Sequence, residues 1–316
     1  MNKKKVVIAA TSGVALSLLG VSYYFFNNAI KRPKSKVKTS TKETVIDPIT
    51  KRRNEFNEAH LGWYQTVEKE TLEMISFDGL ILKAKYIKAK EPTNKTLIAI
   101  HGYHSNGERE YMTYVKFYYD LGYNILLPDD RAHGESEGKY IGFGWLDRID
   151  CIGWINYILS FKNASTQIVL HGISMGAATV LMASGEHLPS QVKAIIADCG
   201  YTSAWDEFAH QLKYYKKLPV FPILHVSNLI SKLIAKYDFK EASALKQVEK
   251  SVTPTLFIHG KKDEFVPTRM VNELYEACQA DKELLLIDEA GHALSHVYEE
   301  ELYHQKVKNF LDRYVR

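Results

Sequence analysis

The segment Gly172-Ile173-Ser174-Met175-Gly176 constrains the fold more than any other part of this 316-residue chain. It follows an apolar, β-branched run that ends at Leu170, and it precedes a stretch of small and apolar residues, 177–183, that favours a helix. Between a buried strand and a helix, Gly-x-Ser-x-Gly predicts a turn so tight that the serine is strained and the flanking residues must be glycine. We therefore predict a strand–turn–helix unit that presents Ser174 as a nucleophile.

A serine hydroxyl needs a base, and the base needs an orienting acid. A strand candidate at 255–258 runs into a turn that holds Asp263, which we prefer to Glu264 as the acid. The next strand candidate, 284–287, leads to a loop that contains His292. The spacing predicts a catalytic triad of Ser174, Asp263 and His292.

The negative charge that develops during acyl transfer needs two backbone N–H donors. One is expected from Met175, which follows the nucleophile and opens a helix. The other is expected from Tyr103, in the loop after a strand at 96–101, where Gly102 lets the backbone approach the substrate. His101 and His104 form too weak a pattern for a metal site, because no third ligand is near in sequence. We predict no metal and no cofactor.

With these motifs in order, the chain resembles the α/β-hydrolase superfamily, since Ser, acid and His follow one another as in that fold. Within it, the chain is similar to small bacterial serine hydrolases related to prolyl-oligopeptidase-like and cinnamoyl-esterase-like proteins. The resemblance covers roughly residues 70–316. The matching segments are His101-Gly102, residues 128–136, residues 172–176, residues 259–267 and Gly291-His292.

One of these segments departs from the family pattern. Asp130-Arg131-Ala132-His133-Gly134 resembles the family's Asp-x-Arg-Gly-x-Gly loop, with Ala132 in place of the usual glycine. The resemblance implies that this loop braces the site, so no catalytic role is assigned to it. Serine at the turn distinguishes the chain from haloalkane dehalogenases and epoxide hydrolases, whose nucleophile is a carboxylate.

Alternating apolar patterns support a mostly parallel, eight-stranded sheet flanked by helices. A hairpin is expected at 72–88, and further strands at 96–101, 124–128, 167–173, 192–198, 254–259 and 283–288. Helices are expected near 108–121, 145–160, 175–185, 267–280 and 297–314. The hydrolase domain is placed at 53–316.

The strand pattern breaks between Gly200 and Ser251, after the sixth strand, where this fold usually carries a cap over the active site. We expect a small helical cap at about 201–251. Its many aromatic residues favour an apolar acyl or aryl pocket. His101, Gly102, Trp205 and Phe208 are candidates for substrate binding.

The N-terminus has a different character. Lys3, Lys4 and Lys5 precede an uncharged stretch whose apolar part, 6–26, could cross a hydrocarbon core of roughly 30 Å at about 1.5 Å per residue. Because its far end is aromatic rather than a cleavage site, 1–30 is predicted to be an uncleaved single-span signal-anchor rather than a removed signal peptide. Residues 31–52 are expected to be a basic linker.

Charge supports the same division of the chain. The whole chain is +4, but residues 1–42 hold nine Lys/Arg and no acid, so residues 43–316 hold 32 Lys/Arg against 37 Asp/Glu, a net −5. The basic segment suits anionic membrane lipid, and the mildly acidic remainder argues against nucleic-acid binding. The lysines on the two sides of the span give conflicting signals for topology. We place the domain at the cell membrane, facing out of the cytoplasm.

Cys151, Cys199 and Cys278 form no motif, so core thiols are expected.

Together these features predict a serine hydrolase that cleaves small acyl esters through an acyl-enzyme. Two alternatives on the same triad stay open, an aminopeptidase or amidase and a thioesterase. An aminopeptidase would need an acidic anchor for the substrate amine, which Asp206, Glu207, Asp238 or Glu241 could supply. A catalytically silent binding scaffold is a more remote alternative. Because no predicted chemistry precedes residue 96, removal of residues 1–42 is expected to leave an active domain.

Overall fold

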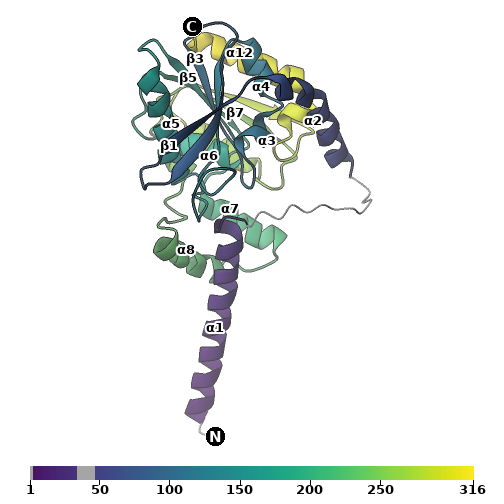
Figure 1. The fold of residues 1–316 in the computed structure, drawn as a ribbon. Helices are drawn as coiled ribbons and strands as arrows, with labels where there is room; N and C mark the ends of the chain where they lie inside the picture. The colour runs from purple at the N-terminus through teal and green to yellow at the C-terminus, as the bar shows by residue number, and fades with distance from the viewer. Residues whose placement is uncertain (1–2, 34–46) are drawn as a thin grey trace.

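A mixed eight-stranded sheet lies at the centre of the molecule (Figure 1). The computed structural model describes residues 3–33 and 47–316, with side chains for residues 17–33 and 47–316. The strands are β1 (Glu70–Ile75), β2 (Ile81–Ile87), β3 (Lys95–Ile100), β4 (Asn124–Pro128), β5 (Gln167–Ile173), β6 (Val192–Asp198), β7 (Thr255–Gly260) and β8 (Lys282–Ile287).

The strand order is β1-β2-β4-β3-β5-β6-β7-β8. Strand β2 is antiparallel to both of its neighbours, and every other adjacent pair from β4 to β8 is parallel. The expected mostly parallel, eight-stranded sheet is therefore confirmed. The carboxyl ends of β5, β7 and β8 meet at one edge, which is where a doubly covered sheet positions its functional loops.

Helices cover both faces of the sheet (Figure 1). One face carries α5 (Asp147–Phe161), α6 (Met175–Ser184) and α10 (Arg269–Ala277), and the other carries α2 (Pro48–Thr66), α3 (Gly107–Tyr111), α4 (Val115–Asp120) and α12 (Glu300–Tyr314). The short helix α11 (Ser295–Tyr298) precedes α12. Strand β5 alternates accordingly, with Ile168 and Leu170 in one core cluster and Val169 in the other.

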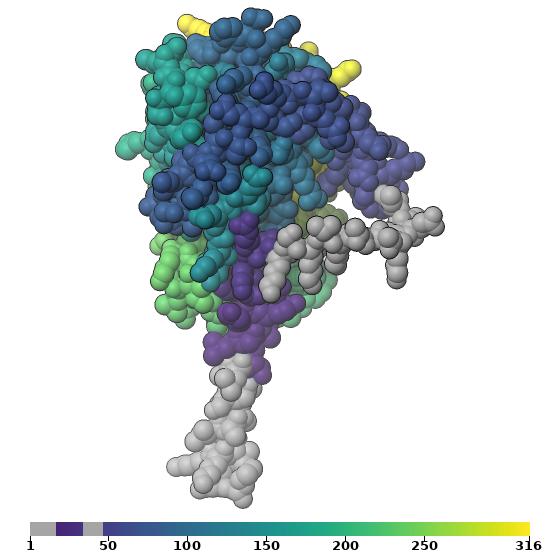
Figure 2. Space-filling view, in the orientation of Figure 1, coloured from purple at the N-terminus to yellow at the C-terminus, as the bar shows by residue number. Residues whose placement is uncertain are grey.

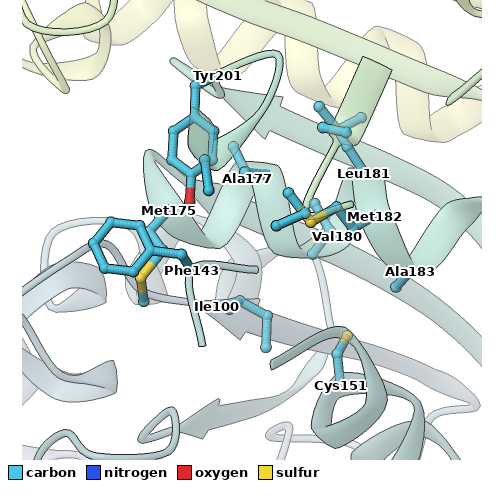
Figure 3. Close-up of a cluster of buried hydrophobic side chains, with 14 of the residues drawn as sticks. Ile100, Phe143, Cys151, Met175, Ala177, Val180, Leu181, Met182, Ala183 and Tyr201 are labelled. Carbon is cyan, nitrogen blue, oxygen red and sulfur yellow. The ribbon is translucent and has the colours of Figure 1, made fainter. Parts of the chain in front are cut away.

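Helix α6 is buried along its whole length, because its small residues allow neighbouring side chains to approach closely (Figure 3). Ala177, Leu181 and Ala183 pack in the same cluster as Cys151 of α5. The three cysteines are free and buried, Cys151, Cys199 and Cys278.

Three helical segments differ from those expected. The helix expected at 108–121 is split into α3 and α4, and the last helix begins at Glu300, after α11. Helix α2 includes residues 48–52, which we had placed in the linker, because the Asp47 carboxylate accepts hydrogen bonds from the N–H groups of Ile49 and Thr50 at 3.0 Å.

The cap follows β6 and lies at the end of the molecule from which α1 emerges (Figure 1). It contains α7 (Ala204–His210), the π-helix η1 (Gln211–Tyr215) and α8 (Ile223–Ile234), and the shorter α9 (Ala244–Val248) then contacts α6.

Arg131 braces the loop after β4. Its guanidinium donates to both carboxylate oxygens of Asp150, at 2.6 and 2.8 Å, and to both of Asp78, at 3.0 and 3.1 Å. Ala132 has a φ of +62°, a left-handed conformation that favours glycine, so the structure explains why related loops carry glycine there.

Helix α1 (Lys3–Ile30) ends inside the fold (Figure 2). Phe26 is 2 % exposed and Ile30 is fully buried. The Ile30 carbonyl accepts a hydrogen bond from the Ile141 N–H at 2.7 Å, and the Arg32 guanidinium donates to the carbonyls of Ser136 and Gly134. The Ser227 hydroxyl of α8 donates to the Ser22 carbonyl at 3.0 Å.

The predicted anchor falls largely on residues 1–16, and much of the predicted linker falls on residues 34–46. Both segments lie outside the residues whose side chains are described. Within the described part of the chain, no helix combines the length and the apolar character needed to cross a membrane.

Candidate active site

Ser174 lies at the sharp turn between β5 and α6. Its φ of +56° and ψ of −115° are strained for a residue with a side chain. A Cβ on Gly172 would lie 2.2 Å from the Gly176 carbonyl oxygen, and a Cβ on Gly176 would lie 1.9 Å from the Ile100 carbonyl oxygen. Both glycines are thus required by close backbone approach, as the sequence pattern predicts.

The three predicted triad residues meet at the carboxyl edge of the sheet. Nε2 of His292 is 2.8 Å from the Ser174 hydroxyl, and Nδ1 is 2.7 Å from Oδ2 of Asp263. His292 follows β8, and Asp263 follows β7, so two loops of neighbouring parallel strands bring the base and the acid to the nucleophile. This arrangement can remove the serine proton and stabilise the resulting imidazolium.

Asp263 is held as a carboxylate. Its Oδ1 accepts hydrogen bonds from the N–H groups of Phe265 and Val266, at 2.9 and 2.8 Å. Burial favours a higher pKa, but hydrogen bonds from His259 and His292 act in the opposite direction and lower the pKa of Asp263 to about 2. The acid therefore stays ionised throughout the neutral range.

His259 is a partner of the triad that begins the matching segment 259–267, and no role was predicted for it. It is fully buried at the end of β7, and its Nε2 lies 3.2 Å from Oδ2 of Asp263 and 2.9 Å from the Val266 carbonyl. Both neighbours are acceptors, so Nε2 carries a proton and helps to orient Asp263.

The predicted oxyanion loop lies against the nucleophile. A Cβ on Gly102 would lie 3.4 Å from Cβ of Ser174, and Tyr103, Ser174 and Met175 line one pocket. The hydroxyl of the Tyr103 side chain donates a hydrogen bond to the Ala29 carbonyl of α1 at 2.9 Å. That the N–H groups of Tyr103 and Met175 bind an oxyanion stays a prediction.

His101 stabilises this loop through hydrogen bonds of its ring. Its ring is fully buried, with Nδ1 2.7 Å from the Gly102 carbonyl, and its Nε2 accepts a hydrogen bond from the Asp130 N–H at 3.0 Å. Both ring nitrogens are thus engaged by the backbone. His101 does not line the pocket, so its predicted role in substrate binding is replaced by a role in loop structure.

The pocket at Ser174 has a volume of about 240 Å³. Its wall is mostly apolar and comes from α1, the 101–103 and 143 loops, the cap and the loop after β7. The lining residues are Phe25, Asn28, Ala29, Tyr103, Phe143, Ser174, Met175, Tyr201, Glu207, Phe208, Gln211, Lys216, Phe265 and Val266.

The two aromatic cap residues that we singled out have different positions. Phe208 is in the wall, in edge contact with Phe143 at 4.5 Å and with Phe25 at 5.8 Å between ring centroids. Trp205 is not in the wall: it packs on His225, and the Lys240 ammonium lies 4.3 Å from its ring. Trp205 is therefore withdrawn as a substrate-binding residue, because its ring packs between α8 and Lys240 and does not line the pocket.

Sequence analysis missed the contribution of α1. Phe25, Asn28 and Ala29 line the pocket. The only signal was the aromatic run before Asn27, which we interpreted as the end of a membrane span. The same residues also suit a buried wall.

Two groups of side chains among the described residues bring three metal-ligating atoms together. One is Cys199, Asp263 and His292, which is the triad region itself, and the other is His296, Glu300 and His304 on α11 and α12. In the second group the Nε2 atoms of His296 and His304 are 2.8 Å apart, the distance of a direct hydrogen bond.

Comparison with known proteins agrees with this architecture. Residues 110–316 match the prolyl oligopeptidase family. The chain is 30 % identical to protein YqkD of Bacillus subtilis over 276 residues, which cover 87 % of this chain and 88 % of YqkD.

Solved structures include both esterases and peptidases. The esterase Pf2001 of Pyrococcus furiosus superposes with a TM-score of 0.65 and 26 % identity, covering 79 % of this chain and 93 % of the esterase. The acylaminoacyl peptidase of Pyrococcus horikoshii superposes with a TM-score of 0.61 and 18 % identity, over 79 % of this chain and 42 % of the peptidase. The chain therefore has the α/β-hydrolase fold and belongs to the prolyl oligopeptidase family.

Proposed function

We propose that the protein is a serine hydrolase that cleaves acyl esters through a covalent acyl-enzyme. The observation that carries this proposal is the continuous relay from Ser174 through His292 to an ionised Asp263. The likeness to an esterase at 26 % identity supports the same reaction class.

The reaction follows from the geometry. Nε2 of His292 takes the hydroxyl proton as Oγ of Ser174 attacks the carbonyl carbon, and the N–H groups of Tyr103 and Met175 bind the developing oxyanion. Collapse of the tetrahedral intermediate breaks the bond to the leaving alcohol, which takes the proton from His292. Water then repeats the sequence on the acyl-enzyme and releases the acid, with no cofactor needed.

The pocket favours a small acyl group. A mostly apolar volume of about 240 Å³ suits a short acyl chain, which we place there, better than an extended peptide. Two of the acids considered as amine anchors are already engaged: Asp206 accepts from the hydroxyls of Thr202 and Ser203, and Asp238 is paired with Lys232. Aminopeptidase, amidase and thioesterase activities remain the alternatives.

The substrate class is tested by comparing p-nitrophenyl esters of rising chain length with aminoacyl p-nitroanilides. We expect the esters to give the higher kcat/KM, and Ser174→Ala to lower kcat by about 10⁴-fold or more for every substrate. Faster anilide turnover would favour the peptidase alternative. Ester turnover at the wild-type rate in Ser174→Ala would remove the proposed nucleophile.

We also propose that residues 1–42 attach the protein to membrane lipid, with the domain on the outer side of the cell membrane. The apolar and basic composition of this segment supports attachment. So does the cap beside α1, which exposes Phe221, Leu229 and Leu233 among the lysines of α8 and its flanks. A small-molecule ester that partitions into lipid would reach the pocket from this side.

A further inference from the structure

Two residues that line the catalytic pocket each carry a buried polar atom with no hydrogen-bond partner among the described residues. These atoms are the hydroxyl of Tyr201 and Oε2 of Glu207. Tyr201 is 2 % exposed and Glu207 is 4 % exposed, and both line the pocket together with Ser174. An unpaired buried polar group costs about 1–3 kcal/mol, so two of them in residues of one wall point to a group outside the protein chain as their partner.

The surroundings of these atoms are apolar. Phe25, Phe143 and Phe208 contribute rings to the same wall. Oε1 of Glu207 accepts a hydrogen bond from Nε2 of Gln211 at 2.7 Å, which leaves Oε2 free. The Tyr201 ring points its hydroxyl toward Met175, the residue after the nucleophile (Figure 3).

Both groups are neutral near pH 7. Burial is the largest cause that raises the pKa of Glu207 to about 8, and repulsion from Asp263 and Asp206 also raises it. The hydrogen bond from Gln211 acts in the opposite direction and lowers the pKa. Burial is the largest cause that raises the pKa of Tyr201 well above its usual value, and the nearby Asp147 acts in the same direction. The other charged side chain that lines this pocket is Lys216, which is exposed at the rim.

A neutral pair of this kind matches one chemical group particularly well. Because Oε1 accepts from Gln211, the proton of the neutral acid lies on Oε2. A hydroxyl can accept a hydrogen bond from Oε2–H of Glu207 and can donate one to the Tyr201 oxygen. An alkyl group would leave both unpaired, and a cation would have to enter an apolar wall opposite a neutral acid.

We propose that Tyr201 and Glu207 form a polar subsite that binds a hydroxyl group on the acyl chain of the substrate, so that the protein prefers hydroxyacyl esters. The inference rests on the proposed function, because it assigns the acyl chain to this pocket. It names the substrate class that the triad alone does not specify.

The test compares p-nitrophenyl esters of equal chain length that carry a methyl, hydroxyl, methoxy or ammonium group, placed at carbon 3 or at the end of a six- to eight-carbon acyl chain. In the wild type we expect at least one hydroxyacyl ester to exceed its alkyl counterpart in kcat/KM by about 10-fold or more. The methoxy ester, which cannot donate, should lose this advantage.

Variants then assign the preference to the two residues. Tyr201→Phe and Glu207→Leu should each lower the hydroxyl-to-alkyl ratio by roughly 5- to 10-fold, whereas Glu207→Gln, which keeps both donor and acceptor capacity, should retain most of it. The matched control is Glu241→Leu at an exposed cap glutamate outside the wall, and it should leave the ratio as in the wild type.

The outcomes separate this inference from the proposed function. A fluorophosphonate probe that labels Ser174 in each variant shows that the site is folded and active. If labelling and alkyl-ester turnover persist but the ratio stays near one, or if the ammonium ester alone is preferred, the hydroxyl subsite is overturned while the esterase proposal stands. If the wild type neither labels nor cleaves any ester, the proposed function itself fails.

Discussion

At the residue scale, Glu207 makes stability depend on pH in an unusual direction. Its pKa is raised to about 8 in the folded protein, mainly by burial, whereas an unfolded glutamate titrates near its ordinary value of about 4.3. Between these two values the folded chain holds a proton that the unfolded chain releases. The stabilising contribution of Glu207 to the free energy of unfolding is therefore fully present below about pH 4, and it is lost as the pH rises toward 8.

This difference predicts the behaviour of Glu207→Gln. Relative to the wild type, the variant should gain stability between pH 5 and pH 8, by an amount on the order of 3 kcal/mol. Urea unfolding at several pH values measures it, with Glu241→Gln at the exposed cap position as the control. Parallel stability curves for Glu207→Gln and the wild type would show that Glu207 is ionised in the folded protein.

The residues of the triad could be predicted because each follows a local rule. Gly172 and Gly176 mark a turn with no room for a side chain, and Asp263 and His292 each follow a strand that can be recognised by its apolar run. Glu207 and Tyr201 could not be placed, because their importance arises from burial and from unpaired atoms. Those properties depend on tertiary packing that no local pattern encodes.

At the scale of elements, the strands were predicted well, and the N-terminal helix was predicted without its contacts to the hydrolase domain. The strand runs of β5 and β6 are bounded by turns and packed on both faces, so their patterns alone define them. Helix α1 carries apolar residues on all sides, and this composition suits a membrane span and a buried contact equally. Only the packing of Phe26 and Ile30 reveals the contact.

We expected an active domain after removal of residues 1–42 because no predicted chemistry precedes residue 96. That reason is wrong, since part of this segment lines the catalytic pocket. Phe25, Asn28 and Ala29 line the pocket although they precede the sheet by many residues. Removing them would open the wall that faces Phe208 and would leave the Tyr103 hydroxyl without its carbonyl partner. The domain that carries the chemistry includes the end of α1.

Two substitutions in α1 test this conclusion. Phe26→Ala should destabilise the protein by about 3–5 kcal/mol, because Phe26 is 2 % exposed and packs against Tyr140. Tyr24→Ala, at a side chain that is 71 % exposed, should change the free energy of unfolding by less than about 0.5 kcal/mol. Chemical unfolding of both variants gives the comparison, and equal costs would place the end of α1 outside the fold.

At the scale of the whole molecule, α1 and the cap lie at the same end (Figure 1). If residues 1–42 hold the protein to lipid, the pocket opens toward the membrane. Attachment by burial of apolar side chains resists salt, whereas attachment by lysines alone weakens as ions screen it.

We expect the full chain to fractionate with membranes in both low and high salt, and a chain that begins at residue 17 to be released while it keeps ester turnover. Protease treatment of intact cells tests the topology, with a cytoplasmic protein as the protection control. Degradation of the domain supports an outward orientation, and protection places it in the cytoplasm. Release of the full chain by salt alone would show that the attachment is electrostatic.

The central claim is that the relay of Ser174, His292 and Asp263 makes Ser174 a reactive nucleophile. The most direct measurement is site-mapped labelling of the folded full chain with a fluorophosphonate probe, followed by mass spectrometry of its peptides. We predict a single adduct on Ser174 that is absent from Ser174→Ala and from denatured protein, and that forms far more slowly in Asp263→Asn. A folded wild type that stays unlabelled, or labelling that persists in Ser174→Ala, would contradict the claim.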